Sequence, residues 1–136
     1  MFREELIFET HGEGDIIDLS PAVRDVVARS GVWDGQVSVF VKGSTAAITT
    51  IEFEPGVLAD LRRALDVIAP KDAVYEHDRA WGDGNGRSHV RAALLGPSVT
   101  IPVQEGTLFS GTWQQVVLIE LDIRSGRTRF VLCTVV

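Results

Sequence analysis

The sequence predicts an α+β fold, in which one domain over residues 1–136 combines a mixed or antiparallel β-sheet with two to three helices. The length of 136 residues fits a single domain. Hydrophobic residues make up 45% and charged residues 24%, which is typical of a globular chain with its own core. Strand-like segments occur in groups, and they do not alternate regularly with helical segments as a parallel sheet would require.

The N-terminal part of the chain predicts a strand followed by a helix. Residues 3–10 mix charged side chains with leucine, isoleucine and phenylalanine, which favours a strand with one face in water. Ser20 and Pro21 are typical of the N-cap and the first position of a helix, and valines then recur at helical spacing until Gly31. We therefore expect a short amphipathic helix over residues 21–30.

The middle of the chain predicts strands, a helix and a long loop, in that order. Residues 36–52 alternate and are rich in β-branched side chains, so they predict two strands or one bent strand with a junction at Gly43-Ser44-Thr45. The clearest helix begins at Pro55 and ends at Pro70, because its aliphatic residues follow an i, i+3/i+4, i+7 pattern. Residues 70–86 contain three glycines and many charges with little periodicity, and we expect a loop there.

The last third predicts a short helix and then a series of strands. Residues 87–96 suit a helix with an apolar side formed by Val90, Ala93 and Leu94. The segment VTIPV precedes a turn at Glu105-Gly106, and a long strand is expected over residues 114–123. A turn at Ser125-Gly126 then leads to RTRFVLCTVV, which we expect to be the hairpin partner of that strand.

Charge and cysteine content exclude several classes of protein. The net charge is −6, and residues 1–36 hold eight acidic against three basic residues, so most of the excess lies at the N-terminal end. An acidic chain lacks the basic stripe that binds phosphate backbones, which argues against nucleic-acid binding. The single cysteine, Cys133, lies in an apolar run and predicts a buried strand thiol. No window approaches the ~18 apolar residues of a membrane span, and we expect a soluble, cytoplasmic protein without membrane contact.

Two histidines near a glycine-rich loop form the first group of candidate functional residues. His77 and His89 flank the Gly82–Gly86 segment together with Asp78, Arg79, Asp83, Arg87 and Arg91. Imidazole titrates near neutrality and ligates metals, and arginine forks match phosphate or carboxylate oxygens. Two histidines twelve residues apart fit no compact zinc signature, so the residues alone leave surface or structural histidines open.

Glu120 and Asp122 form a second group, because residues two apart lie on the same face of a strand. Such carboxylates can share a proton, bind a metal or pair with arginine. The alternative is a solvated strand face on which they pair with Arg127 or Arg129 across the hairpin.

The other two candidates lie at strand ends. Ser44 and Thr45, next to Gly43, offer hydroxyl and backbone N–H groups to an anion, although such clusters also serve as turns. Trp113 stands beside Gln114 at the entry to a strand, where the indole can stack on a ligand or belong to the core or an interface.

The stretch from about Gly35 to Arg129 contains motifs in a particular order. The segment GPSVTIPVQEGTLFSGTWQ is followed by an acid, Glu120, and is preceded by STAAITTIEFEPGVLADL and by histidines in YEH and SHV. These motifs resemble the widespread YjbQ-type family, known as the secondary thiamine-phosphate synthase family. The positions that match its most specific segment are Ser98, Ile101, Pro102, Val103, Gly106, Gly111, Thr112, Trp113 and Gln114.

The resemblance implies α+β domains that assemble as homotrimers, with a pocket at or near the subunit contact. It implies thiamine-phosphate synthesis, in which a hydroxymethylpyrimidine diphosphate joins a thiazole phosphate and pyrophosphate leaves. Cations and usually a divalent metal, Mg or Zn, stabilise such a leaving group. The resemblance assigns His77, His89 and Glu52 to catalysis, and the two histidines also to metal binding. It assigns contacts with the small phosphorylated ligand to Ser44, Thr45, Arg87, Arg91, Trp113, Gln114 and Glu120.

The sequence departs from the family pattern at two positions. Gly43 stands where the family has a histidine, and Phe53 stands where an asparagine usually follows the glutamate. A three-histidine cluster would therefore be reduced to two histidines. The alternative to an enzyme is a non-catalytic homo-oligomer of the same fold that binds a small anion or serves as a scaffold.

Overall fold

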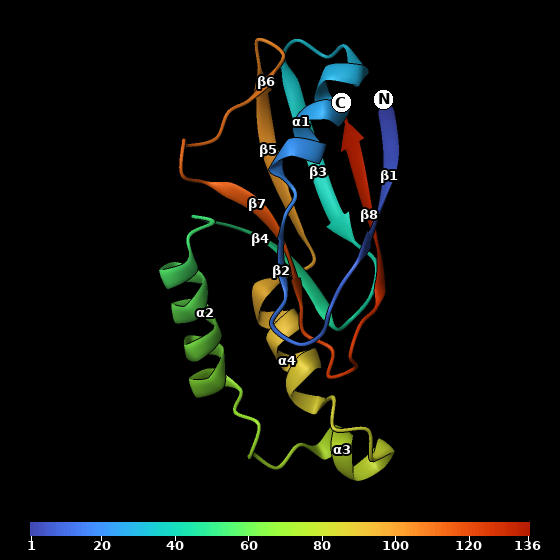
Figure 1. Cartoon of the computed structure of the whole chain (residues 1–136). Helices are drawn as coiled ribbons and strands as arrows, with labels where there is room; N and C mark the ends of the chain where they lie inside the picture. Colours follow the sequence, from blue (N-terminus) through green and yellow to red (C-terminus); the bar gives the residue numbers. More distant parts are fainter.

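A computed structural model describes residues 1–136 as two antiparallel sheets and four helices (Figure 1). The five-stranded sheet has the order β1 (Phe2–Glu9), β8 (Thr128–Val135), β3 (Gly35–Val41), β5 (Ser98–Gln104) and β6 (Thr107–Leu108). The three-stranded sheet has the order β2 (Ile16–Asp18), β7 (Gln115–Glu120) and β4 (Ala46–Ile51). The helices are α1 (Ser20–Ser30), α2 (Pro55–Ile68), α3 (Glu76–Trp81) and α4 (Gly86–Leu95). All strand pairs are antiparallel, as the absence of regular βαβ alternation predicts.

Two apolar clusters form the core, one on each side of β7. The larger cluster joins the valines of α1 to the inner faces of β3, β5 and β8, and Val116 and Leu118 of β7 belong to it. The smaller cluster lies against α2 and α4 and takes Val117 and Ile119 from β7. Because alternate residues of a strand face opposite sides, β7 is buried on both faces.

The predicted hairpin of the last two strands is wrong. β8 pairs with β1 and β3 in the five-stranded sheet, while β7 pairs with β2 and β4 in the other sheet. Both strands are apolar enough to be central strands, so each has a neighbour on both sides. The segment between them therefore crosses from one sheet to the other. Residues 36–52 do the same, because β3 and β4 are two strands in different sheets, connected through Gly43.

Several helix predictions are confirmed and others need correction. The helices near residues 21–30 and 55–69 are present as α1 and α2. Ser20 is not a side-chain cap of α1, because its Oγ accepts a hydrogen bond from the Val116 N–H at 2.8 Å. The expected loop over residues 70–86 contains α3. The expected apolar side of α4 is exposed at Val90 and Leu94, and the helix buries Arg91 instead.

Two other predictions concern the interior and the membrane. Cys133 is buried as expected, and burial raises the pKa of its thiol to about 11, so the thiol stays protonated near neutral pH. None of the four helices has the length and apolar character that a membrane crossing requires.

Candidate functional site

A polar cavity of about 270 Å³ lies where the two sheets meet. Five segments form its wall: the β3–β4 connection, the α3–α4 connection, α4 itself, the β7–β8 connection and the start of β8. None of the residues that line it is hydrophobic. They are Gly43, Ser44, Thr45, Asp83, Asn85, His89, Asp122, Arg124, Arg127 and Arg129. The cavity therefore unites side chains that are far apart in the sequence, and we call it the polar cavity.

The structure brings the two candidate histidines together at the edge of the polar cavity. His77 lies on α3 and His89 on α4, and their ring centroids are 4.5 Å apart. The chain reverses between the two short helices at Gly82, whose φ of 64° is in the left-handed region. His77 Nε2 lies 3.2 Å from Asp83 Oδ2. The Asn85 N–H and His77 hold the pKa of Asp83 below its ordinary value, so this carboxylate stays ionised.

One group of side chains has the chemistry of a divalent-metal site. Ligand atoms of His77, Asp78 and Asp83 all lie within 4.8 Å of one another. One oxygen of Asp78 accepts the Gly86 N–H and one oxygen of Asp83 accepts the Asn85 N–H, while the second oxygen of Asp83 lies 3.2 Å from His77 Nε2. A cation would replace this histidine contact and bind the second oxygen of each aspartate. A nitrogen with two carboxylate oxygens suits Zn²⁺ or Mn²⁺ better than Mg²⁺, which prefers oxygen ligands. His77 belongs to this group, and His89 stacks against it without belonging to it.

Glu120 and Arg129 form a buried ion pair beneath the polar cavity. The exposed fractions of their side chains are 0% and 2%. Arg129 Nε and Nη2 donate to the two carboxylate oxygens at 2.8 and 2.5 Å, and the Thr10 hydroxyl donates at 2.7 Å. Burial alone raises the pKa of Glu120, but the hydrogen bonds from Arg129, Thr10 and the Asp122 N–H outweigh it, and the pKa is lowered.

Glu120 and Asp122 therefore agree in part with the second interpretation of the sequence, a solvated strand face that pairs with arginines. Pairing with Arg127 and Arg129 is confirmed, since Arg127 Nη1 also donates to Asp122 Oδ2 at 2.7 Å. The solvated strand face is wrong, because Glu120 and Asp122 are both buried. Glu120 does not line the polar cavity, but it binds two residues that do, Arg129 and Asp122.

Arg129 presents one nitrogen to the polar cavity. Its Nε and Nη2 donate to Glu120 and Thr45, while Nη1 has no hydrogen-bond partner in the protein. No fully buried side-chain nitrogen lacks a partner, so Nη1 must reach the cavity solvent. A Cβ atom at Gly43 would lie 2.9 Å from Nη1. Because Gly43 has no side chain, the Nη1 edge of the Arg129 guanidinium has room beside it.

Sequence reasoning did not assign Arg124, Arg127 or Arg129 to the site. They stand close together in RSGRTR, on both sides of the Ser125-Gly126 turn, and the strand-face interpretation includes only Arg127 and Arg129, as strand partners of acidic residues. A signal was present, because a carboxylate inside an apolar strand requires a buried cation nearby. That cation is Arg129, and because Glu120 holds it in place, it can bind an anionic ligand with little loss of side-chain entropy.

The other predicted site residues lie outside the polar cavity of the same chain. Glu52 and Trp113 line a separate hollow with Phe53, beyond the far end of β4. Six residues of β4 separate this hollow from Thr45, a span of about 20 Å at the usual strand rise. Gln114 Nε2 donates to Thr50 Oγ1 near a third hollow. One chain by itself therefore does not bring Glu52 to the histidines.

The two predicted anion-binding arginines of α4 are engaged by carboxylates. Arg87 donates to both oxygens of Glu13 at 2.8 and 3.0 Å, and this contact holds the pKa of Glu13 below its ordinary value. Arg91 is buried, and it donates to the Ala69 carbonyl and to Asp66. Both guanidiniums face away from the polar cavity, and their assignment to a phosphorylated ligand stays a prediction.

Comparison with known proteins gives a consistent result. A family model described as "UPF0047 protein YjbQ-like" matches residues 4–136. A UPF0047 protein of Methanothermobacter thermautotrophicus is 38% identical over 122 residues, which cover 90% of this chain and 84% of the relative. The UPF0047 protein YugU of Bacillus subtilis is 29% identical over 93% of this chain and 94% of its own length.

Solved structures agree with the sequence relatives. A YbjQ-like protein of unknown function from Sulfolobus solfataricus superposes with a TM-score of 0.87 at 31% identity, over 97% of this chain and 95% of the other. An uncharacterised YjbQ/UPF0047 protein from Clostridium acetobutylicum gives a TM-score of 0.87 at 33% identity, over 98% and 99%. A hypothetical protein from Aeropyrum pernix gives a TM-score of 0.90 at 26% identity, over 100% and 98%.

Proposed function

Since the chain belongs to the YjbQ-like UPF0047 family, we propose that it binds a small phosphorylated molecule in the polar cavity. The observation on which this proposal rests is the guanidinium of Arg129. Its charge is fixed by Glu120, and its Nη1 faces the cavity without a partner. A rigid donor of this kind suits a phosphate oxygen, because a charge-assisted hydrogen bond is strongest where little side-chain entropy is lost.

Further donors surround the same point. The Arg124 side chain is 66% exposed, and its only carboxylate neighbour is Asp122, whose oxygen lies 3.9 Å from Nε. Ser44 lines the cavity with an exposed hydroxyl, and the His89 ring adds a donor when protonated. A phosphate group has three acceptor oxygens, so these donors can bind it together. A neutral ligand would gain much less from the same arrangement.

The candidate reaction is the formation of thiamine phosphate. A thiazole nitrogen would form a bond to the pyrimidine methylene carbon, while the bond from that carbon to the diphosphate oxygen breaks and pyrophosphate leaves with the electron pair. Arg129 and Arg124 would stabilise the departing charge, and His89, which is outside the candidate metal group, would donate a proton to it. A divalent cation held by His77, Asp78 and Asp83 would add further positive charge.

A homotrimer would complete this site. In one chain Glu52 lies about 20 Å from Thr45, and only a second copy could bring a glutamate at this position to the histidines. All three tryptophans are exposed, Trp33 at 65%, Trp81 at 76% and Trp113 at 72%. Indole side chains are normally covered, so this exposure supports a subunit contact that includes Trp113 and the neighbouring Glu52.

Titration with pyrophosphate tests the proposal. We expect His89→Ala and His77→Ala to weaken pyrophosphate binding by about tenfold or more in calorimetry, because each removes a donor near the cavity. His11→Ala is the matched control, since His11 is the third histidine and its side chain is 88% exposed outside the cavity. Folded His77 and His89 variants that bind pyrophosphate as tightly as the unsubstituted protein would contradict the proposal.

The non-catalytic alternative is favoured by Gly43. An active family member would have a histidine there, and in this chain a side chain at position 43 would meet Arg129 Nη1. A Gly43→His variant, alone and combined with Arg129→Gln, separates the two functions in an assay for thiamine phosphate. Product from the unsubstituted protein or from either variant favours an active or decayed enzyme. Pyrophosphate binding without any product favours a binding protein.

A further inference from the structure

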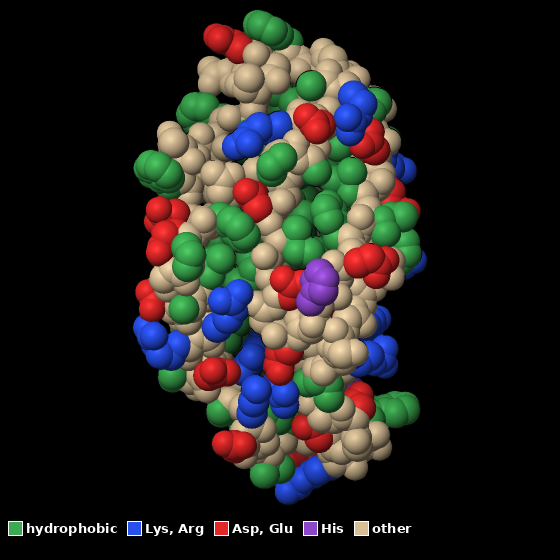
Figure 2. Space-filling view, viewed as in Figure 1, with side chains coloured by type: hydrophobic (Ala, Val, Ile, Leu, Met, Phe, Trp, Pro, Cys, Tyr) green, Lys and Arg blue, Asp and Glu red, His purple; other side chains and the backbone are tan.

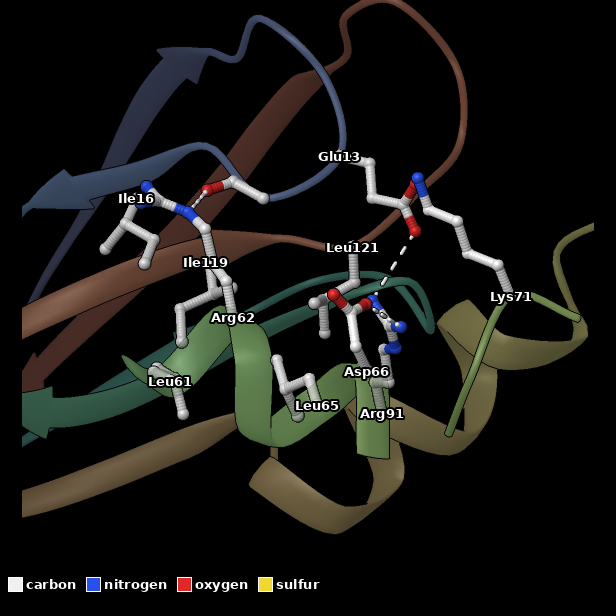
Figure 3. Close-up of a pocket in the computed structure, with 11 residues that line it drawn as sticks. Glu13, Ile16, Leu61, Arg62, Leu65, Asp66, Lys71, Arg91, Ile119 and Leu121 are labelled. Carbon is white, nitrogen blue, oxygen red and sulfur yellow. Dashed lines mark hydrogen bonds and ion pairs between the residues drawn. The ribbon is translucent and has the colours of Figure 1, made fainter. Parts of the chain in front are cut away.

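A second cavity, of about 180 Å³, lies between α2 and the strands β2 and β7 (Figure 3). Its floor is apolar and consists of buried or half-buried side chains. These are Ile16, Leu61, Leu65, Ile119 and Leu121. An apolar cavity of roughly 150 Å³ in another protein accommodates one benzene molecule, so this cavity has room for a single ring or a branched chain of similar size.

Charged groups stand on two sides of this cavity. Figure 3 shows Glu13, Asp66, Lys71 and Arg91 gathered on one side, and Arg62 extending from α2 to the opposite side, near Ile16. In Figure 2, Lys and Arg side chains gather in the lower half of the same face, over the region between α2 and α4. The cavity is thus amphipathic, with an apolar body and a charged rim.

The rim has more available positive charge than negative charge. Glu13 is already bound by both nitrogens of Arg87, and Asp66 accepts from Arg91 at 2.9 Å. Arg62 has no carboxylate partner, because its Nε donates to the Gly14 carbonyl at 2.8 Å.

Lys71 adds positive charge on the other side of the rim. Its Nζ lies 3.9 Å from Glu13, a carboxylate that Arg87 already binds, and its side chain is 62% exposed. Arg62 is therefore the rim cation without a carboxylate partner, in a chain whose net charge is −6.

We infer that this cavity binds a small organic anion, with an apolar body about the size of one ring and a carboxylate or phosphate head. The body would rest on Leu61, Leu65 and Ile119, and the head would bind the Arg62 guanidinium. A cavity with apolar walls alone would favour a neutral ligand. A cavity with charged groups alone would favour inorganic ions. The combination selects a molecule that has both parts.

This site is independent of the polar cavity. The two cavities share no residue, and α4 contributes Arg91 to this cavity and His89 to the polar cavity. A failure of phosphorylated-ligand binding at His89 would therefore leave the present inference intact, and the reverse also holds.

Titration of the whole protein with benzoate and phenyl phosphate, followed by methyl NMR, tests the inference. We expect one or both to shift the methyl signals of Ile16, Leu61 and Leu65, and benzyl alcohol and inorganic phosphate to bind about tenfold more weakly. The result with benzoate against phenyl phosphate identifies the preferred head group. Absence of shifts at these methyls with both anions would overturn the inference, as would equal binding of benzyl alcohol.

Two variants with matched controls locate the binding. Arg62→Gln should weaken anion binding about tenfold, while Arg63→Gln should leave it unchanged, because Arg63 is the next residue of α2 and pairs with Asp60 outside the cavity. Leu61→Trp should fill the cavity and abolish binding, whereas Val67→Trp, at an exposed position of the same helix, should not. Circular dichroism checks that each variant is folded. Equal effects of Arg62→Gln and Arg63→Gln would refute the site.

Discussion

Because Glu120 and Arg129 are buried, their ion pair matters more for stability than an ion pair at the surface. The pair is almost completely removed from water and satisfied by Thr10, Thr45 and the Asp122 N–H. A buried ion pair contributes little compared with well-packed apolar residues, but loss of one partner leaves an uncompensated charge. The stability of this region therefore depends on both groups staying ionised.

We expect Glu120→Gln to lower the free energy of unfolding by about 3–5 kcal/mol, because the Arg129 charge would remain buried without its counter-ion. Urea denaturation measures the change. Glu5→Gln, at an exposed position of β1, is the control and should change stability by less than about 0.5 kcal/mol. A loss below about 1 kcal/mol for Glu120→Gln would show that the pair is not essential.

Acidification should destabilise the protein through the same carboxylate. The folded pKa of Glu120 lies below its ordinary value of 4.5, so the unfolded chain binds the proton more readily than the native chain. The contribution of Glu120 is fully present above that value and is lost as the pH falls through the folded pKa. Unfolding midpoints measured between pH 7 and pH 3 should therefore decrease below about pH 4.5, and less steeply in Glu120→Gln. An equal decrease in both proteins would assign the acid sensitivity to other groups.

Gly43 is constrained in two ways, by its backbone and by its neighbour. Its φ of 126° strains any other residue, and an added Cβ would press on Arg129 Nη1. Gly43→Ala should cost about 1–3 kcal/mol and also weaken pyrophosphate binding. Gly31→Ala provides the comparison, because Gly31 has a φ of 70° but no atom within 4 Å of a new Cβ. If Gly43→Ala binds pyrophosphate as well as Gly31→Ala does, Nη1 does not contact the ligand.

At the level of helices and strands, local patterns predict what an element is, and packing decides its partners. The periodicity of α2 and the capping by Glu54, which accepts from the Gly56 and Val57 N–H groups, are local, and this helix is predicted correctly. The partners of β7 and β8 depend on contacts between residues that are 64 (Ile51 and Gln115) to 133 (Phe2 and Val135) positions apart, which no turn at Ser125-Gly126 can determine.

Ser20 illustrates the same limit within a single helix. Its hydroxyl is buried and accepts the Val116 N–H, which is a contact between α1 and β7 and not a helix cap. We expect Ser20→Ala to cost about 1–3 kcal/mol, because a buried backbone N–H would lose its acceptor. Ser98→Ala, at an exposed position of β5, should be close to neutral. Chemical denaturation measures both, and equal stabilities would show that water replaces the hydroxyl.

At the level of the whole molecule, contacts between distant parts of the chain decide the role of its charged residues. Part of the acidic excess of residues 1–36 is used in ion pairs, because Glu4 binds Arg29 and Glu13 binds Arg87 of α4. The candidate site was predictable where residues are close in sequence, as for His77 and His89 around one loop. It was not predictable for Arg129, whose nearness to Gly43 depends on two crossings between sheets.

If the proposed trimer forms, light scattering after size exclusion should give a mass of three times the 14.8 kDa chain. Trp113→Ala should shift this mass toward the single chain, because the exposed indole would be covered in the assembly. The exposed surface residue Val67, changed to Ala, tests for nonspecific loss of assembly. A single-chain mass for the unsubstituted protein at micromolar concentration would argue against the proposed trimer.

The pairing of β1 with β8, in which Phe2 lies opposite Val135, has a consequence for how the molecule folds. During synthesis β1 cannot pair until β8 has been made, so the five-stranded sheet is completed late. Such distant contacts raise the contact order and slow folding relative to helical proteins of the same size. During that interval β1 exposes an unpaired edge, and its alternate charged residues, Arg3, Glu5 and Glu9, protect it from pairing with another chain.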